Sequence, residues 1–251
     1  MCCFSQAVES VTNTNLFARS AEKGRQFLVY SMTLSSKEDL AMILPLPVPV
    51  GSAEDAVRFI DLKGYPDFFK HLKAGFPEPK ALALTRGEKG EAPGHDEAPL
   101  AVVQVGDFEA SFVPAVKDFS RLDARFRLPD TAWDKLPGIK GFGFAVFKLK
   151  KGAKTVHPMA FEFPRVNPRQ LFFPTLHIHD GQVHPKAAFD HSLYCQTREG
   201  DTTSMLQWEE TELPAGRFMK VDAALGLVDG ARHCFRKQIR GEQKNEDIVV
   251  G

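Results

Sequence analysis

The chain has 251 residues, of which 43% are hydrophobic, 10% aromatic and 25% charged. This composition is typical of a globular protein and excludes a disordered, collagen-like or coiled-coil chain. The 32 Lys and Arg residues balance 32 Asp and Glu residues, so the formal net charge is zero. A neutral chain has no general electrostatic attraction to nucleic acid or to an anionic membrane, and we expect neither as a partner.

The N-terminus, the apolar stretches and the cysteines bear on localisation. Residues 1–10 lack the basic and then apolar pattern of a secretory signal peptide. The longest apolar stretch, Leu40–Val50, is interrupted by prolines and is too short to span a membrane. Four cysteines in such a chain indicate thiols in a reducing compartment. We therefore expect a cytoplasmic protein.

The apolar pattern mostly predicts β-strands. Many of the 21 Phe residues alternate with small or polar residues, and a period of two is typical of half-buried strands. In chain order, the predicted strands are Cys3–Val8, Asn15–Ala18, Gln26–Thr33, Leu40–Leu44, Leu100–Val105, Glu109–Val113, Phe142–Leu149, Thr155–Phe163, Leu171–His179, Phe189–Gln196 and His233–Ile239.

Fewer segments predict helices. Ser52 followed by Asp55 resembles a capping box that opens a helix over Ala53–Ile60. Pro66 suits the first turn of a helix that ends at Lys73. Further short helices are predicted at Phe119–Phe126, Asp130–Lys135 and Arg217–Leu227.

The domain organisation follows from these elements. The segment Thr85–Pro99 is rich in Gly, Glu and Pro, which predicts a solvated loop (residues 85–99) rather than a linker. The chain shows no internal repeat and no change of composition that would mark a boundary. The sequence therefore predicts a single α+β domain over residues 1–251, dominated by antiparallel β-sheet.

The adjacent cysteines Cys2 and Cys3 form the first candidate site and are the candidate catalytic residues. Removal of the initiator Met places a thiol and an α-amine on Cys2. Such an amine, with a pKa of about 7.7–8.0, suits a base acting on that thiol. Thiol and amine together also chelate a soft metal ion. The alternative is that both cysteines pack as small apolar residues of an N-terminal strand.

The second candidate site is a histidine-rich segment, with His177, His179, His184 and His191. On a strand, His177 and His179 point to the same face and can reach one ion. A turn after His179 lets the returning strand supply a third ligand from His184 or His191. Imidazole ligands suit zinc, copper, iron or nickel. The alternative is a hairpin whose histidines are exposed or hydrogen-bonded to neighbouring strands.

Arginines are weaker candidates. A guanidinium binds a carboxylate substrate through two parallel hydrogen bonds. The arginines considered for this role, each with a surface charge as its alternative, are Arg19, Arg25, Arg125, Arg127, Arg165 and Arg169.

The beginning of the chain resembles a bacterial family of unknown function. The likeness lies in the opening Cys2-Cys3-Phe4, in the Leu-Phe pair of Asn15–Arg19, in Gln26–Tyr30 and in the proline-interrupted strand Leu40–Pro47. It covers about the first fifth of the chain. Because that family has no assigned activity, the resemblance implies only that the cysteine pair recurs.

The Met-Cys start also resembles choloylglycine-hydrolase-like enzymes of the N-terminal-nucleophile class. Cys2 matches the nucleophile of that family, and Arg19 matches an Arg at the end of its next strand. The Asp that follows this Arg in the family is absent here, where Ser20-Ala21-Glu22 follow. The resemblance implies an amidohydrolase in which Cys2 attacks an amide carbonyl and its own α-amine carries the proton.

Three functional hypotheses result. The leading one is a metal-dependent oxidoreductase with one copper, zinc or iron ion, copper being the first choice because thiolates favour Cu(I) or Zn. Its predicted ligands are His177 and His179, completed from His184, His191, Cys2 and Cys3. The second hypothesis is the cysteine amidohydrolase, and the third is a non-enzymatic β-sheet binding domain. For the two enzymes we expect a small-molecule or peptide substrate.

Overall fold

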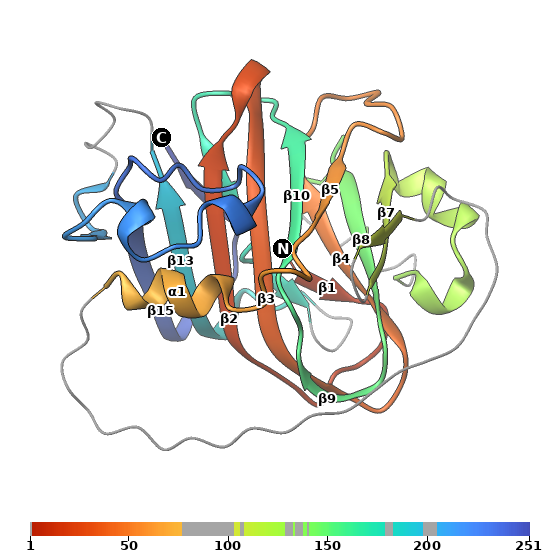
Figure 1. Ribbon diagram of the computed structural model, residues 1–251. Helices are drawn as coiled ribbons and strands as arrows, with labels where there is room; N and C mark the ends of the chain where they lie inside the picture. Colours follow the sequence, from red (N-terminus) through yellow and green to blue (C-terminus); the bar gives the residue numbers. More distant parts are fainter. Residues whose placement is uncertain are drawn as a thin grey trace.

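The computed structural model describes most of the chain, with gaps. The described residues are 2–76, 103–105, 108–128, 133, 138–139, 141–178, 183–197 and 205–251. Two large β-sheets dominate this part of the chain (Figure 1).

The first large sheet, called sheet I, has six strands in the order β12-β1-β4-β8-β7-β6. The strands are β12 (His177–Ile178), β1 (Cys2–Phe4), β4 (Leu40–Leu46), β8 (Gly143–Leu149), β7 (Phe108–Val113) and β6 (Val103–Val105). All neighbours are antiparallel except β1 and β12, which run parallel at one edge.

The second large sheet, called sheet II, has the order β14-β15-β13-β2-β3-β10-β5, and β9 also pairs with β3. Its strands are β14 (Glu209–Glu210), β15 (Phe235–Lys244), β13 (Lys186–Gln196), β2 (Ser10–Ser20), β3 (Arg25–Ser36), β10 (Met159–Pro164), β5 (Arg58–Asp61) and β9 (Gly152–Thr155). The pair β13 and β2 is parallel, and the other pairs are antiparallel. A small third sheet joins β11 (Leu171–Phe173) to β16 (Ile248–Val250).

The central apolar cluster joins the two large sheets. It contains Met42 and Phe147 of sheet I together with Leu28 and Phe161 of sheet II, and all four side chains are buried. The rings of Phe147 and Phe161 lie 5.9 Å apart, measured between centroids. Burying such a side chain contributes about 1.5–3 kcal/mol to folding, so this cluster is the main source of stability.

Short helical segments cover the outer face of each sheet. On sheet II the cover is α1 (Phe68–Ala74) with the 3₁₀ segments η5 (Ala215–Arg217) and η6 (Asp222–Ala224), and Figure 1 shows α1 crossing the sheet. On sheet I the cover is η2 (Val116–Arg121) with η3 (Ala124–Phe126). No helix among the described residues has both the length and the apolarity to cross a membrane.

Buried carboxamide side chains take the place of strand partners at three points. In each case the amide donates to the C=O of one residue and accepts from the N–H of the same residue, as a neighbouring strand would. The pairs are Gln26 with Phe172, Gln196 with Asp229, and Asn245 with His177. Their role is to satisfy main-chain groups where regular pairing stops.

The predicted predominance of antiparallel sheet is confirmed. Period two correctly located β3, β4, β7, β8 and β13, although the observed ends differ by a few residues. The long strand predicted over Thr155–Phe163 is instead split between β9 and β10, and Leu171–His179 is split between β11 and β12. In each place three residues outside any strand, 156–158 and 174–176, separate the two parts. Strands β9 and β10 both pair with β3, at different stretches of it, whereas β11 pairs with β16 and β12 pairs with β1.

The helix predictions are less accurate. The helix expected to end at Lys73 is confirmed as α1, but the one expected over Ala53–Ile60 is wrong. There the chain turns and then forms β5, because Phe59 and Ile60 pair with the edge of β10. The helices expected at Phe119–Phe126 and Arg217–Leu227 are short 3₁₀ turns. The solvated loop at 85–99 and most of Asp130–Lys135 lie outside the described residues.

Candidate functional site

The edge of sheet I brings the two predicted clusters together. Strand β1 lies between β4 and β12, and its parallel register places Cys2 opposite His177 and Cys3 opposite Ile178. Segments about 175 residues apart in the sequence are therefore neighbours. The sequence alone left this question open.

Cys3 behaves as a core residue. Its side chain is fully buried in the apolar cluster on the outer face of sheet I, together with Ile43 and Phe144. A thiol in such surroundings packs as a small apolar group, as the alternative interpretation of the cysteine pair proposed. The described residues do not include the Cys2 side chain, so its predicted role stays a prediction.

Only two of the four predicted histidines come together among the described residues. His177 of β12 and His191 of β13 are buried with ring centroids 5.2 Å apart. Phe189 contacts both rings, with centroid distances of 4.4 and 5.0 Å. His184 is exposed, and His179 lies outside the described residues. The two buried imidazoles are thus part of an aromatic cluster around Phe189.

This arrangement does not support a metal centre. Among the described residues, no three His, Cys, Asp or Glu side chains are grouped closely enough to hold an ion. His177 and His191 pack side by side against an aromatic ring, and His184 points to solvent instead of completing a ligand set. The metal-dependent oxidoreductase hypothesis is therefore wrong, and the roles predicted for Cys2 and His179 as individual residues remain untested predictions.

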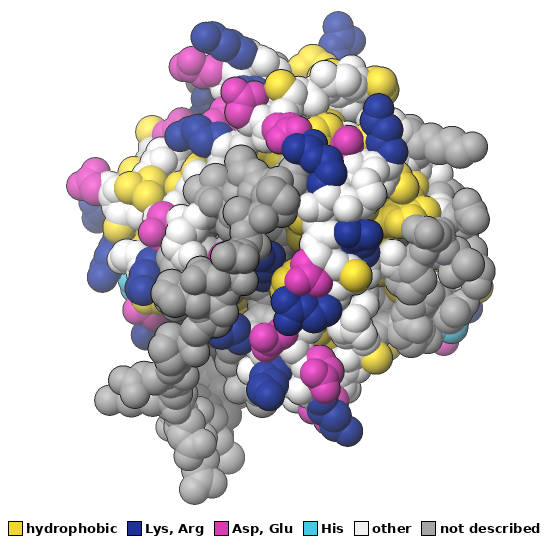
Figure 2. Space-filling view, turned by 90° about the vertical axis from the view of Figure 1, so that its right-hand side faces the viewer, with side chains coloured by type: hydrophobic (Ala, Val, Ile, Leu, Met, Phe, Trp, Pro, Cys, Tyr) yellow, Lys and Arg dark blue, Asp and Glu magenta, His cyan; other side chains and the backbone are white. Residues whose placement is uncertain are grey.

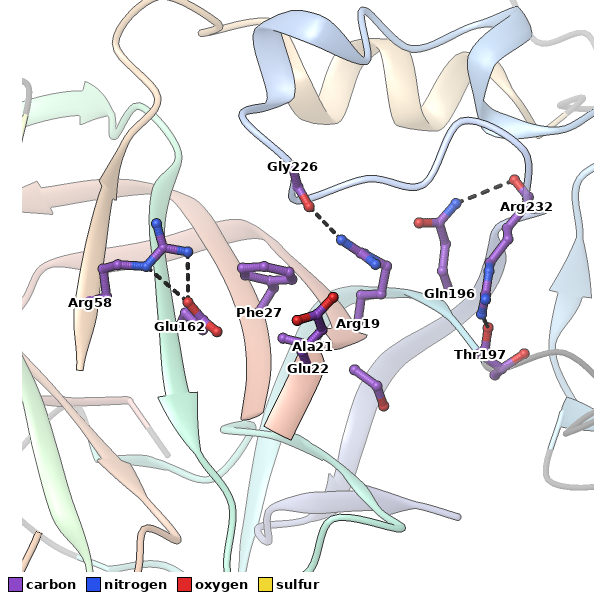
Figure 3. A pocket seen from close by; sticks show the side chains of 11 residues that line it. Arg19, Ala21, Glu22, Phe27, Arg58, Glu162, Gln196, Thr197, Gly226 and Arg232 are labelled. Carbon is purple, nitrogen blue, oxygen red and sulfur yellow. Dashed lines mark hydrogen bonds and ion pairs between the residues drawn. The ribbon is translucent and has the colours of Figure 1, made fainter. Parts of the chain in front are cut away.

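A polar pocket that the sequence analysis missed lies on the outer face of sheet II. It has a volume of about 770 Å³. Figure 3 shows that side chains of the sheet form its floor and that the segment around Gly226 borders it. The residues that decide its character are Arg19, Phe27, Arg58, Glu162, Gln196 and Arg232.

Strand register assembles this pocket from a single row of side chains. The row crosses five strands, and residues directly opposite each other in a sheet point to the same face. Its members, in order from β13 to β5, are Gln196, Arg19, Phe27, Glu162 and Arg58. They come from four separate regions of the sequence, which explains why no sequence motif signals the pocket.

Glu162 is the acidic centre of one end of the row. Its largely buried carboxylate accepts a hydrogen bond from Nε of Arg25 at 3.0 Å and one from Nη2 of Arg58 at 2.6 Å. Two guanidinium groups thus face one carboxylate. This end of the pocket keeps a surplus positive charge.

Arg19 dominates the other end. Its Nε donates to the carbonyl oxygen of Leu227 at 2.8 Å, its Nη2 donates to that of Gly226, and its guanidinium lies 5.0 Å from the centre of the Phe27 ring. Burial lowers the pKa of Arg19, an effect that Asp229 opposes and Arg232 reinforces. The positive charge is therefore held in a desolvated place beside a second arginine.

Arg19 and Arg25 are among the arginines that the sequence offers as carboxylate binders, with a surface charge as the alternative. Arg19 also matches, together with Cys2, residues of the choloylglycine-hydrolase-like enzymes. The structure places Arg19 in sheet II and Cys2 in sheet I, so this chain uses Arg19 in the polar pocket. Glu162 was missed, although a single acid in the apolar strand segment Ala160–Phe163 was a usable signal.

Comparison with known proteins identifies a fold relationship. No protein-family model matches the sequence. The crystal structure of baculovirus P35 is similar to 97% of this chain and 96% of that chain, with a TM-score of 0.50 and 12% sequence identity. A mutated baculovirus P35 after caspase cleavage gives a TM-score of 0.49 at 12% identity, covering 95% and 99% of the two chains. P35 in the caspase-8/P35 complex gives 0.48 at 10% identity, covering 96% of each chain. This chain therefore shares the fold of baculovirus P35 over nearly its whole length, and at such low identity the likeness concerns the fold alone.

Proposed function

We propose that this chain is a non-enzymatic β-sheet protein that binds another protein, and that its partner is a protease of the caspase class. The observation that carries the proposal is the similarity to P35, which extends over 97% of this chain and 96% of that one. P35 itself has been described in a complex with caspase-8 and after cleavage by a caspase. Because one fold can serve several functions, the caspase partner is tested directly by a binding experiment.

The chemistry of the described thiols fits a binding protein better than an enzyme. Cys3, Cys195 and Cys234 are all fully buried. Burial raises the pKa of Cys234 to about 12, which keeps this thiol protonated and poorly nucleophilic near neutral pH. Together with the lack of a grouped ligand set in the described residues, this favours the third of the hypotheses drawn from the sequence. Under this proposal the chain has a protein partner in place of the small-molecule or peptide substrate expected for an enzyme.

A binding experiment with caspase-8 tests the proposal. The purified chain is mixed with catalytically inactive caspase-8 and passed over a size-exclusion column, and active caspase-8 is assayed in parallel on a fluorogenic peptide. We expect the two proteins to elute together and the protease activity to fall as the chain is added. An unrelated serine protease and a heat-unfolded sample of the chain serve as controls.

The outcomes separate three cases. Co-elution with the inactive protease supports binding through the folded surface. If caspase-8 cleaves the chain, but the two proteins do not elute together and the protease activity does not fall, the chain is only a substrate and the proposal is overturned. Separate elution with undiminished activity at a tenfold molar excess of the chain would also overturn it.

A further inference from the structure

The polar pocket on sheet II has positive charge at both ends and an aromatic ring between them. We propose that it binds an extended acidic peptide segment of a partner protein, with two carboxylates four residues apart. The argument uses only the pocket and does not depend on the partner being a caspase.

Each end of the pocket has guanidinium N–H groups that can donate to a ligand. Arg58 donates to Glu162 through Nε and Nη2, and no described residue accepts a hydrogen bond from its Nη1. At the other end, Arg19 uses Nε and Nη2 on main-chain carbonyls, which leaves its Nη1 without an acceptor among the described residues. Arg232 pairs with Asp229 through Nε and donates to the carbonyl oxygen of Thr197 through Nη1. Its Nη2 likewise has no acceptor among the described residues.

These donors are accessible to a ligand. The side chain of Arg58 is 62% exposed and that of Arg232 is 40% exposed. Charge-assisted hydrogen bonds from guanidinium to carboxylate are among the strongest polar contacts that proteins make. Both ends can therefore bind an incoming carboxylate without breaking the existing ion pairs.

The local charge balance favours an anion. The pocket lining has three arginines and two glutamates, so its formal net charge is +1; they are Arg19, Arg58, Arg232, Glu22 and Glu162. Adding the two ion-pair partners outside the lining, Arg25 and Asp229, leaves this net charge at +1. Burial and the neighbouring Arg232 lower the pKa of Arg19, so a carboxylate placed here would offset a desolvated charge. On the face seen in Figure 2, basic and acidic side chains are interspersed.

Strand geometry sets the distance between the two ends. Arg19 and Arg58 are three strand steps apart in the row, from β2 through β3 and β10 to β5. At a spacing of about 4.8 Å per step, this corresponds to about 14 Å. An extended peptide covers about 13–14 Å in four residues, and residues four apart point to the same face. A small dicarboxylate is too short to reach both ends.

The side chains in the middle of the row determine which residue fits between the two acids of the peptide. The second residue after the first acid would lie over Phe27 and Glu162, which neighbour each other across β3 and β10. The half-buried Phe27 ring offers an apolar contact there, whereas Glu162 would repel a third acid. The preferred segment is therefore acid, any residue, apolar residue, any residue, acid.

An NMR titration of the ¹⁵N-labelled full chain tests this inference. The probe is acetyl-Glu-Ser-Leu-Ser-Glu-amide. Two control peptides replace both Glu by Gln, or place both Glu next to each other at one end. We expect the probe alone to shift the resonances of the pocket, including the Nε–H groups of Arg19 and Arg232, and its affinity to fall as salt is added.

Matched arginine variants locate the site. Arg58→Gln removes one end of the pocket and leaves Arg25 on Glu162, so we expect about a tenfold loss of affinity for the probe. Arg125→Gln removes a similarly exposed arginine that is also paired with an acid, Asp123, and lies outside the pocket lining. We expect this variant to bind as the parent does, and a parent-like spectrum of each variant confirms that it is folded.

The other results would overturn the inference. If the Gln peptide binds as tightly as the probe, binding does not depend on the carboxylates. If the peptide with adjacent acids binds as tightly as the probe, binding does not depend on their spacing. Unchanged affinity in Arg58→Gln, or binding of succinate as tight as that of the probe, would exclude a two-ended peptide site. Caspase-8 is absent from this experiment, so failure of the peptide to bind leaves the proposed caspase partner to its own test.

Discussion

Cys234 illustrates how the fold controls the chemistry of a single side chain. Its thiol is fully buried under the cover of sheet II. Desolvation raises its pKa from 9.0 to about 12 and outweighs the hydrogen bond with Gln196, which lowers the pKa. In the unfolded chain the thiol loses its proton near its ordinary pKa. Between these two values the unfolded chain binds fewer protons than the folded one, so the stability falls as the pH rises.

We therefore expect the free energy of unfolding to depend on Cys234 only at high pH. Between the ordinary pKa of 9.0 and the raised value of about 12, the parent chain should lose up to about 1.4 kcal/mol per pH unit more than Cys234→Ala. Urea unfolding at pH 8, 10 and 11 measures this difference. Parallel pH dependences of the two proteins would show that the thiol ionises equally well in both states.

At the scale of elements, the short strand β12 depends on a side chain for half of its pairing. One side of β12 pairs with β1. On the other side, Asn245 accepts from the N–H of His177 at 2.9 Å and donates to the carbonyls of His177 and His184 at 2.9 and 3.0 Å. This buried carboxamide holds the edge of sheet I beside the N-terminal strand.

Replacing Asn245 by Leu should destabilise the protein. Leu has a similar size but leaves the main-chain groups of His177 without their partners, and each such loss costs about 1–3 kcal/mol. For the two groups we expect a total of about 2–6 kcal/mol, with faster hydrogen exchange at the His177 amide.

Asn167→Leu is the matched control, because Asn167 is exposed and accepts one local bond from the N–H of Arg169. It should change the stability by no more than about 0.5 kcal/mol. Similar stabilities of the Asn245→Leu and Asn167→Leu variants in urea unfolding would contradict the role given to Asn245.

At the scale of the whole molecule, the central cluster links sheets I and II, and the outer clusters lie on either side of it. A core shared by both sheets favours one cooperative unit, as the single-domain prediction for residues 1–251 requires. The two tryptophans report on different places. Trp133 packs on Phe119 and Phe144 at the outer face of sheet I, and Trp208 packs on Phe173 near the third sheet.

Single-tryptophan variants test this cooperativity. Trp133→Phe leaves Trp208 as the only reporter, and Trp208→Phe leaves Trp133. We expect fluorescence and far-UV circular dichroism to give one midpoint of urea unfolding within each variant. A fluorescence midpoint that differs clearly from the circular dichroism midpoint would show that the chain contains more than one unfolding unit.

The sequence also shows where prediction from local patterns ends. Segments such as Gly141–Phe147 and Ala160–Phe163 signal strands because Phe alternates there with smaller or polar residues, and this pattern lies within consecutive residues. The pattern predicts half-buried strands, whereas β8 and β10 are buried on both faces because the outer clusters cover the second face of each sheet. The edge strand β5 was missed, because a short segment that starts after a capping-like signal carries too little pattern of its own. The histidine spacing suggested a metal site, yet ligand geometry depends on where β12 and β13 lie relative to each other.

The sequence by itself determined the β-rich class, the main strands and the helix α1, because these depend on side chains close together in the chain. Tertiary structure alone decided that β1 lies beside β12 and that Arg19, Phe27, Glu162 and Arg58 stand in one row. Strand order and register are set by which distant apolar faces can be buried together, and shifting a strand by one residue turns all its side chains to the opposite face. The polar pocket of sheet II exists because this strand order and register place its side chains in one row.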